Sequence, residues 1–251
     1  MERRLRFRHV FGDVAHEKYD CVKPASIYTE SCLIKGNSKY LGFSWAASGG
    51  GNLAILRIDS PTKLPPDIPL VMGHTGTVLD IEFSPFCENL LATASDDTTI
   101  KIWDLPDEVK EDMTQPIATL AGHQKKVNLL AFNPSAEYIL ASAANDSTVK
   151  VWNVQKPDEA VFTISLPDNV VSMDWNIDGS LLLTCCKDKM IRIIDPREQK
   201  VIKELEGHEG SKSMKGVWMG TTGYFATTGF SRDMKRQIGL WKYDDLESGK
   251  P

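Results

Sequence analysis

The chain contains an internal repeat, and this repeat constrains the fold more than any other feature. Residues 73–105 open with Gly-His and close near Trp-Asp, and residues 122–154 follow the same order from Gly-His to Trp-Asn. Each copy holds three short runs of β-branched or alternating apolar residues separated by turn residues, which is typical of strands. In the first copy these runs are 78–83, 90–95 and 99–104. We therefore expect a series of similar all-β units.

The opening Gly-His, the closing Trp-Asp and the spacing of 49 residues from Gly73 to Gly122 resemble the WD-repeat signature, whose period is about 40 to 45 residues. This resemblance implies a β-propeller with blades of four-stranded antiparallel sheet. A third Gly-His begins at Gly207, 85 residues after Gly122, so one degenerate unit lies between them. We expect about five blades in an incomplete ring, the fifth without an outer strand, with approximate bounds 27–72, 73–121, 122–165, 166–206 and 207–246.

The same resemblance implies a polar network in each blade. The Gly-His histidine bonds a Ser or Thr on the second strand and an Asp in the next turn, and the hydroxyl also meets the Trp indole. On this chain the network residues are His74, Thr93, Asp97 and Trp103, then His123, Ser142, Asp146 and Trp152, then His208, Thr227 and Trp241, with Thr184 and Asp188 remaining in the fourth unit. A hydroxyl, a histidine and a carboxylate also make up catalytic triads, but geometry and not residue type identifies a triad. Because the set recurs once per repeat, we favour a structural role.

Two units depart from the network pattern. In the fourth unit Ile194 stands where the Trp is expected and no Gly-His comes before it. In the fifth unit Asp233 is a poor match for the network Asp because its turn is longer. We therefore expect partial networks in both.

Composition excludes several classes of function. The formal net charge is −5, whereas a general nucleic-acid binder needs a basic surface. Five cysteines without a Cys-x-x-Cys pair indicate neither a zinc site nor a disulfide framework, so we expect reduced thiols, no metal and no cofactor. No uninterrupted apolar run approaches 18 residues, so no transmembrane segment is expected.

Two irregular stretches admit more than one interpretation. Residues 48–51, Ser-Gly-Gly-Gly, could cradle a phosphate, but a strand and not a helix is predicted to follow, so a hairpin turn is favoured. Residues 105–115 are rich in charge and are predicted to form a solvated surface insertion.

Segments outside the repeat pattern resemble the coronin family, and they occur in order across nearly the whole chain. They are Phe7–Gly12 followed by Tyr19-Asp20, then Ala47–Gly51, then Cys186–Arg197, and then His208–Gly210 with Thr227–Arg232 and Arg236-Gln237. The resemblance implies a non-enzymatic, cytoplasmic adaptor on the actin cytoskeleton. It would bind actin filaments, regulate their organisation and engage the branched-filament nucleation complex. Typical members carry seven blades, a further extension and a coiled coil, so we expect a partial chain.

Actin filaments are acidic, so a partner of net negative charge must present a focused basic surface. Lys23 occupies the position where coronins typically have an actin-contacting arginine, although lysine lacks the bidentate fork. The other candidates for filament contact are Arg4, Arg6, Arg8, Lys187, Lys189, Arg192, Arg197, Arg232, Lys235 and Arg236. The alternative for each is a solvated charge without a partner.

Residues 4–11 alternate basic and apolar side chains, which predicts an extended edge strand. This strand is a candidate to close the open edge of the blades, within one chain or by exchange or edge pairing between two copies. The alternative is a disordered basic arm.

Two other functions compete with the actin adaptor. One is a general WD-repeat scaffold with a non-actin partner. The other is a propeller enzyme, which would need unique groups converging on the channel. The sequence leaves no spacing of His, Glu or Cys for that chemistry, because the repeats account for the His and Asp residues.

Overall fold

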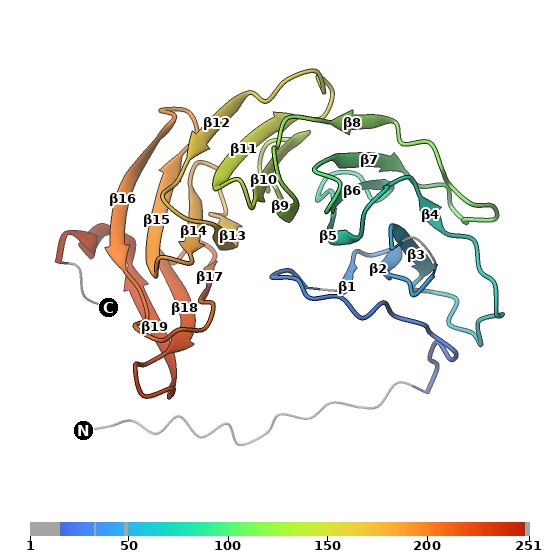
Figure 1. The fold of residues 1–251 in the computed structure, drawn as a ribbon, viewed down its shortest axis with the longest axis horizontal. Helices are drawn as coiled ribbons and strands as arrows, with labels where there is room; N and C mark the ends of the chain where they lie inside the picture. The colour runs from blue at the N-terminus through green and yellow to red at the C-terminus, as the bar shows by residue number, and fades with distance from the viewer. Residues whose placement is uncertain (1–15, 33, 48–49, 249–251) are drawn as a thin grey trace.

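The computed structural model describes residues 16–32, 34–47 and 50–248. Apart from one short 3-10 helix, η1 (Tyr243–Ser248), its regular elements are β-strands. Five antiparallel sheets stand side by side around an arc, and the arc does not close into a ring within the described residues (Figure 1). The prediction of an all-β propeller with five blades and an open outline is confirmed.

The first two sheets each hold four strands in sequence order. Sheet 1 contains β1 (Ile34–Gly36), β2 (Tyr40–Ser44), β3 (Asn52–Arg57) and β4 (Val71–Met72). Sheet 2 contains β5 (Val78–Phe83), β6 (Leu90–Ser95), β7 (Ile100–Asp104) and β8 (Ala118–Leu120).

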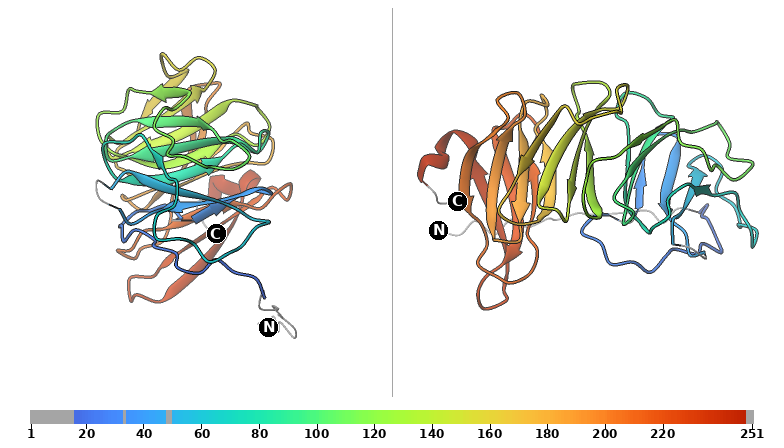
Figure 2. Two further views of the ribbon diagram at one scale, coloured as in Figure 1. Left: turned by 90° about the vertical axis from the view of Figure 1, so that its right-hand side faces the viewer. Right: turned by 45° about the horizontal axis from the view of Figure 1, so that its top comes forward.

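Sheets 3 and 4 repeat this order, and sheet 5 has three strands. Sheet 3 contains β9 (Val127–Phe132), β10 (Ile139–Ala144), β11 (Thr148–Asn153) and β12 (Phe162–Ser165). Sheet 4 contains β13 (Val170–Trp175), β14 (Leu182–Cys186), β15 (Met190–Asp195) and β16 (Lys200–Glu206). Sheet 5 contains β17 (Lys215–Trp218), β18 (Tyr224–Phe230) and β19 (Arg236–Lys242). The first strand of each sheet lies on the inner side of the arc and the last strand on the outer side (Figure 1), and the tilted view on the right of Figure 2 shows the sheets side by side along the arc.

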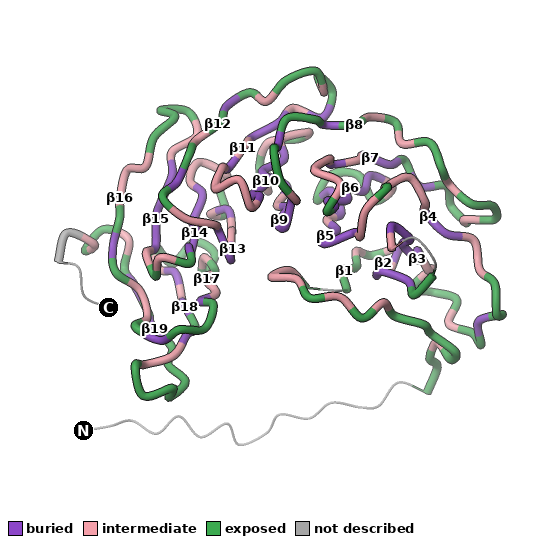
Figure 3. Tube along the Cα trace, viewed as in Figure 1, coloured by how far each residue is buried: buried purple, intermediate pink, exposed green. Residues whose placement is uncertain are grey.

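The middle strands of sheets 2, 3 and 4 are buried because each of these sheets packs between two others (Figure 3). Successive side chains of a strand point to opposite faces. On β6, Leu91 packs with Tyr40 and Trp103 toward sheet 1, whereas Leu90 packs with Leu130 toward sheet 3. A middle strand therefore needs small or apolar side chains on both faces, which gives the continuous apolar runs of the sequence.

Two carboxylates, one buried and one half-buried, join the inner strands of neighbouring sheets. Asp80 on β5 accepts a hydrogen bond from the backbone N–H of Leu130 on β9 at 2.7 Å. In the same way Asp174 on β13 accepts from the backbone N–H of Trp218 on β17 at 2.7 Å. Burial raises the pKa of Asp80 to about 7 and that of Asp174 to about 6. These side chains hold adjacent sheets together at the inner rim of the arc.

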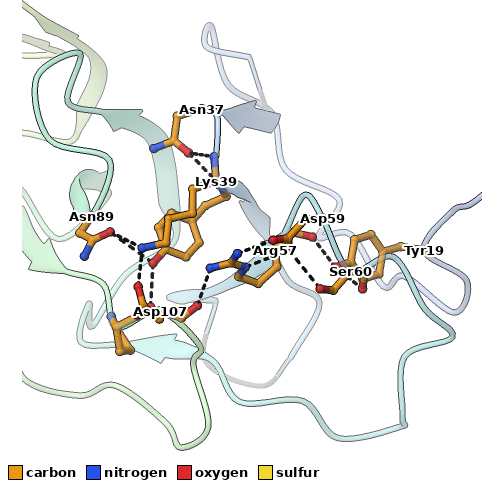
Figure 4. Close-up of polar contacts among 10 residues, drawn as sticks. Tyr19, Asn37, Lys39, Arg57, Asp59, Ser60, Asn89 and Asp107 are labelled. Atoms are coloured by element: carbon orange, nitrogen blue, oxygen red, sulfur yellow. Dashed lines mark hydrogen bonds and ion pairs between the residues drawn. The ribbon is translucent and has the colours of Figure 1, made fainter.

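The insertion at 105–115 is not only a solvated loop, which corrects the sequence interpretation. Asp112 accepts a hydrogen bond from the backbone N–H of Leu70 at 2.9 Å, and Met113 forms a β-bridge with Val71. The Lys39 ammonium lies 2.5 Å from a carboxylate oxygen of Asp107 (Figure 4). The insertion therefore extends sheet 2 over the outer edge of sheet 1.

The segment before β1 crosses the open side of the arc. Glu30 accepts a hydrogen bond from the Ser213 hydroxyl at 3.0 Å, and its carboxylate lies 3.3 Å from the Lys215 ammonium. Lys215 also donates to the carbonyl oxygen of Val171 at 2.6 Å. On the other side of the segment, Thr29 and Ser31 donate to the carbonyl oxygen of Leu79 at 2.8 and 2.6 Å. Sheet 5 is thus tied to the beginning of the described chain.

Candidate functional site

The network of sheet 2 is a chain of hydrogen bonds with one consistent direction. The Trp103 indole N–H donates to the Thr93 hydroxyl at 2.9 Å. That hydroxyl lies 2.8 Å from His74 Nε2, and His74 Nδ1 lies 2.9 Å from an Asp97 oxygen. If the hydroxyl donates to Nε2, the proton of neutral His74 stands on Nδ1 and is donated to the carboxylate. Each group then has a partner, as a buried network requires.

Sheet 3 contains the same arrangement. Trp152 donates to the Ser142 hydroxyl at 2.8 Å, the hydroxyl lies 2.8 Å from His123 Nε2, and His123 Nδ1 lies 3.0 Å from Asp146. Thr148 donates to the other carboxylate oxygen of Asp146 at 2.6 Å. Two sheets therefore hold one polar motif in equivalent places.

Burial and hydrogen bonding set the charges in these networks. Burial lowers the pKa of His123 despite its bond to Asp146, so the imidazole is neutral near pH 7. Burial alone would raise the pKa of Asp97, but hydrogen bonds from His74 and Thr99 outweigh it and hold that pKa below its ordinary value. The hydroxyls of Thr93 and Ser142 are buried and already accept an indole N–H. This geometry serves to join the strands and leaves no nucleophile exposed to a substrate.

Sheet 5 uses a glutamine where the other sheets use an aspartate. His208 Nε2 lies 3.0 Å from the Thr227 hydroxyl, which accepts from the Trp241 indole at 2.8 Å. His208 Nδ1 lies 3.2 Å from Gln237 Oε1. Gln237 was not among the network residues expected from the sequence. Its position in the sequence could have identified it: Gln237 lies four residues before Trp241. Thr99 and Thr148 lie four residues before the tryptophans of sheets 2 and 3.

In sheet 4 an arginine takes the place of the histidine network. The Thr184 hydroxyl donates to the carbonyl oxygen of Arg192 at 3.1 Å. The Arg192 guanidinium binds Asp188 at 2.6 Å and Glu204 at 2.6 Å, and the residue is 3% exposed. Arg192 therefore lies inside the sheet, with both carboxylates bound to it, and is not part of a surface that a filament could touch.

Most of the remaining basic candidates lie on one face. We call this the loop face, and it is formed by the loops between the second and third strands of each sheet and by the loops that lead into the next sheet. His74 and Asp97 meet there from the two kinds of loop. Lys23 belongs to it because its carbonyl oxygen accepts from the backbone N–H of Ala46 in the β2–β3 loop at 2.8 Å. The Lys23 side chain is exposed, and its ammonium donates to the carbonyl oxygen of Pro66 at 3.1 Å.

Sheets 4 and 5 contribute the other basic residues of the loop face. The following are exposed in or beside the β14–β15 and β18–β19 loops: Lys187, Lys189, Arg232, Lys235 and Arg236. Arg197 is also exposed, but it lies in the β15–β16 turn on the opposite face. The structure therefore separates Arg197 from the other candidates. Arg4, Arg6 and Arg8, with the expected strand at 4–11, lie outside the described residues.

Basic residues on the opposite face of sheet 1 are largely neutralised by carboxylates (Figure 4). Lys39 binds Asp107 and also donates to Asn89 Oδ1 at 2.9 Å. Arg57 forms an ion pair with Asp59. Carboxylates of the same chain thus neutralise the charges of Lys39 and Arg57. In contrast, Lys23, Lys187 and Lys189 make no ion pair among the described residues.

The described part of the chain contains no group of three or more His, Cys, Asp or Glu side chains arranged to hold a metal ion. It also contains no helix with the length and apolar character needed to span a membrane.

Comparison with protein families gives two kinds of match. Residues 3–63 match a domain of unknown function, DUF1899. Residues 68–104, 114–153 and 159–195 match the WD domain, G-beta repeat. These three matches overlap the second, third and fourth expected units in turn. The first match begins at residue 68, just before the start of the second unit at residue 73.

Comparison with solved structures agrees with the fold. The WD40 domain of Toxoplasma gondii coronin is 36% identical, with a TM-score of 0.88 over 92% of this chain and 60% of that one. A chain of the mitotic checkpoint complex reaches a TM-score of 0.73 at 17% identity, a likeness in fold alone.

Similar sequences span nearly the whole chain. A coronin-like protein of Saccharomyces cerevisiae is 40% identical over 98% of this chain, and a coronin-like protein of Schizosaccharomyces pombe is 40% identical over 97%. Coronin-2B of Xenopus laevis is 42% identical over 96%. The chain spans 40%, 41% and 51% of the lengths of these relatives. In sequence, repeat pattern and fold, the chain belongs to the coronin family.

Proposed function

We propose that this protein is a non-enzymatic adaptor that binds actin filaments through the loop face. Membership of the coronin family supports the choice of partner. The observation that carries the proposal is that Lys23, Lys187, Lys189, Arg232, Lys235 and Arg236 lie on one face of a chain whose net charge is −5. A focused basic surface of this kind raises the rate and specificity of encounter with an acidic polymer.

The position of the face also supports this function. It combines Lys23, in the segment before sheet 1, with residues of sheets 4 and 5, and the Glu30–Lys215 contact holds this segment against sheet 5. A surface that extends over several sheets can touch more than one subunit of a filament. Through this contact the protein would organise filaments and bring the branched-filament nucleation complex to them. This role places the protein in the cytoplasm, at the actin cytoskeleton.

Filament co-sedimentation with matched charge reversals tests the proposal. Lys23→Glu and Arg232→Glu each place a negative charge on the loop face and should weaken binding about 10-fold at low salt, because like charges then meet the acidic filament. Arg197→Glu is the control, since it makes the same change in charge on the opposite face. The difference between these variants should shrink as salt is raised. Equal binding by all three variants at every salt concentration would exclude the loop face.

The main competing function is a WD-repeat scaffold for a different protein. No contact in the described residues favours it over actin. If purified filaments fail to sediment the wild-type protein at low salt, while the protein retains a cytosolic partner, the scaffold function would replace the adaptor.

The proposal includes pairing between two copies at sheet 5. Among the described residues β19 has a strand partner on one side only, and Ile238 and Leu240 on it are 81% and 51% exposed. Such an edge favours addition of another strand. Sedimentation velocity over a range of concentrations should show a dimer that Ile238→Lys weakens, and a monomer at all concentrations would exclude the pairing.

A further inference from the structure

A cavity on the loop face lies where three distant segments meet. Its volume is about 330 Å³. Residues 28–30 reach it across the arc, the turn after β14 forms one wall, and the loop between β16 and β17 forms the other. The side chains that matter for its chemistry are Glu30, Lys187, Lys189, His208, Lys212 and Ser213.

The cavity has a net positive charge that the part of the chain described by the structure leaves uncompensated. Lys187, Lys189 and Lys212 line it, and none of the three has a carboxylate within ion-pair distance among the described residues. Its one acidic residue, Glu30, is already bound by Lys215 and by the Ser213 hydroxyl. Three lysines therefore line a cavity whose one acidic residue is already paired.

Two of these lysines are held in place. The Lys189 ammonium donates to the carbonyl oxygen of Glu209 at 2.7 Å. The Lys212 ammonium lies over the Phe230 ring, 5.1 Å from its centre. An ammonium has three N–H donors, so each can still donate to a ligand. Fixing the donors before binding reduces the entropy that a ligand must offset.

The other polar groups of the cavity wall are not available as catalytic groups. The cavity is therefore suited to binding a ligand and not to carrying out a reaction. Both ring nitrogens of His208 are occupied, by Thr227 and by Gln237. Burial raises the pKa of the Cys186 thiol to about 11, so it is not a thiolate near pH 7.

A second cavity, of about 490 Å³, adjoins the first and shares Lys189, His208, Gly210 and Ser211 with it. Its wall contains Glu206, which makes no ion pair among the described residues. The two cavities together form a groove with a cationic end and an anionic side. A groove of this kind fits an extended chain better than the head group of a membrane lipid, and the net charge of −5 opposes approach to an anionic membrane.

We propose that this groove binds a phosphorylated segment of a partner protein. The phosphate of a phosphoserine or phosphothreonine enters the smaller cavity and accepts hydrogen bonds from Lys187, Lys189 and Lys212. A basic residue near the phosphate in the same segment lies against Glu206 in the larger cavity. The site shares Lys187 and Lys189 with the proposed filament face, but Lys212 is not among the filament candidates and the ligand is a phosphorylated segment and not actin.

The test uses the chain alone, without actin. Isotope-labelled protein is titrated with O-phosphoserine and with a Gly-Ser-Lys peptide series in which one serine is phosphorylated or not. Amide signals of residues 186–189 and 208–214 should move, and the phosphorylated peptide should bind at least 10-fold more tightly than the unphosphorylated one. Lys187→Gln and Lys212→Gln should each weaken phosphopeptide binding about 10-fold. Lys156→Gln, an exposed lysine between β11 and β12, is the matched control.

Three outcomes would overturn the proposal. One is equal affinity for the two peptides, and another is unchanged phosphopeptide affinity in Lys187→Gln and Lys212→Gln. The third is binding to vesicles that contain phosphorylated lipids without binding to the phosphopeptide, which would assign the cavity to a membrane. None of these outcomes bears on co-sedimentation of the Lys23 variant with filaments, so the two proposals can fail separately.

Discussion

Glu30 and Lys215 are 185 residues apart in the sequence, and their side chains meet across the open side of the arc. Sheet 1 lies at one end of the arc and sheet 5 at the other, so this contact joins the two ends. The Glu30 side chain is 16% exposed and that of Lys215 is 44% exposed. A half-exposed pair of this kind stabilises a fold modestly, but here it also fixes the distance between the two ends.

A double-mutant cycle measures this contact. We expect Glu30→Gln and Lys215→Met to be coupled by roughly 1 kcal/mol in the free energy of urea unfolding, because each removes the charge that the other partner binds. A matched cycle on Lys200 and Glu198, an exposed pair on the opposite face, should give roughly half a kcal/mol or less. Equal coupling in the two cycles would show that the cross-arc contact adds nothing.

Ser142→Ala should destabilise the fold by about 2 to 4 kcal/mol in urea unfolding. The Ser142 hydroxyl is fully buried, and its removal leaves the Trp152 indole N–H and His123 Nε2 without a partner. Thr163→Val is the control, because within the described residues the hydroxyl of exposed Thr163 is bound by the Lys150 ammonium alone; its effect should stay within about 0.5 kcal/mol. Comparable losses in the two variants would argue against the network as a source of stability.

Asp174 should make stability depend on pH between about 4 and 7. Burial raises its pKa to about 6, above the value near 4 of an unfolded chain, so the folded state holds the proton more tightly. The resulting stabilisation is complete below pH 4 and is lost as the pH rises through 6. We expect the unfolding free energy of the wild type, relative to Asp174→Asn, to fall by up to about 3 kcal/mol over this interval. If the difference in unfolding free energy between the wild type and Asp174→Asn stays constant from pH 4 to 7, the raised pKa of Asp174 is contradicted.

Three of the five cysteines should react with a thiol reagent in the native protein. Cys21, Cys32 and Cys87 are exposed, whereas Cys185 and Cys186 are buried. Burial raises the pKa of both buried thiols, that of Cys186 to about 11, so neither contains much thiolate. Titration before and after denaturation should give three and then five thiols, and a fast fourth thiol in native protein would show that sheet 4 opens.

The fold was predictable because the network residues recur at fixed places in each unit. A histidine, a hydroxyl, a carboxylate and a tryptophan at constant intervals identify the blades even where loop lengths differ. Gln237 was missed because the longer turn in sheet 5 displaces the aspartate position, and only a count back from Trp241 finds its replacement.

The error at Arg192 has a different cause. A run of basic residues from Lys187 to Arg197 suggests one surface, but β15 is the third strand of a sheet packed on both sides, so its side chains are buried. Asp188, four residues earlier, was the local sign of an internal ion pair. The contacts of Glu30 and of the insertion at 105–115 join segments far apart in the chain, and no local pattern in the sequence reports them.

The carboxylates of Asp80 and Asp174 give the inner rim a property that the outer strands lack. Each accepts from a backbone N–H of the adjacent sheet, and that N–H is released only when the two sheets separate. Hydrogen exchange at the Leu130 and Trp218 amides would therefore measure how often neighbouring blades separate at the inner rim of the arc.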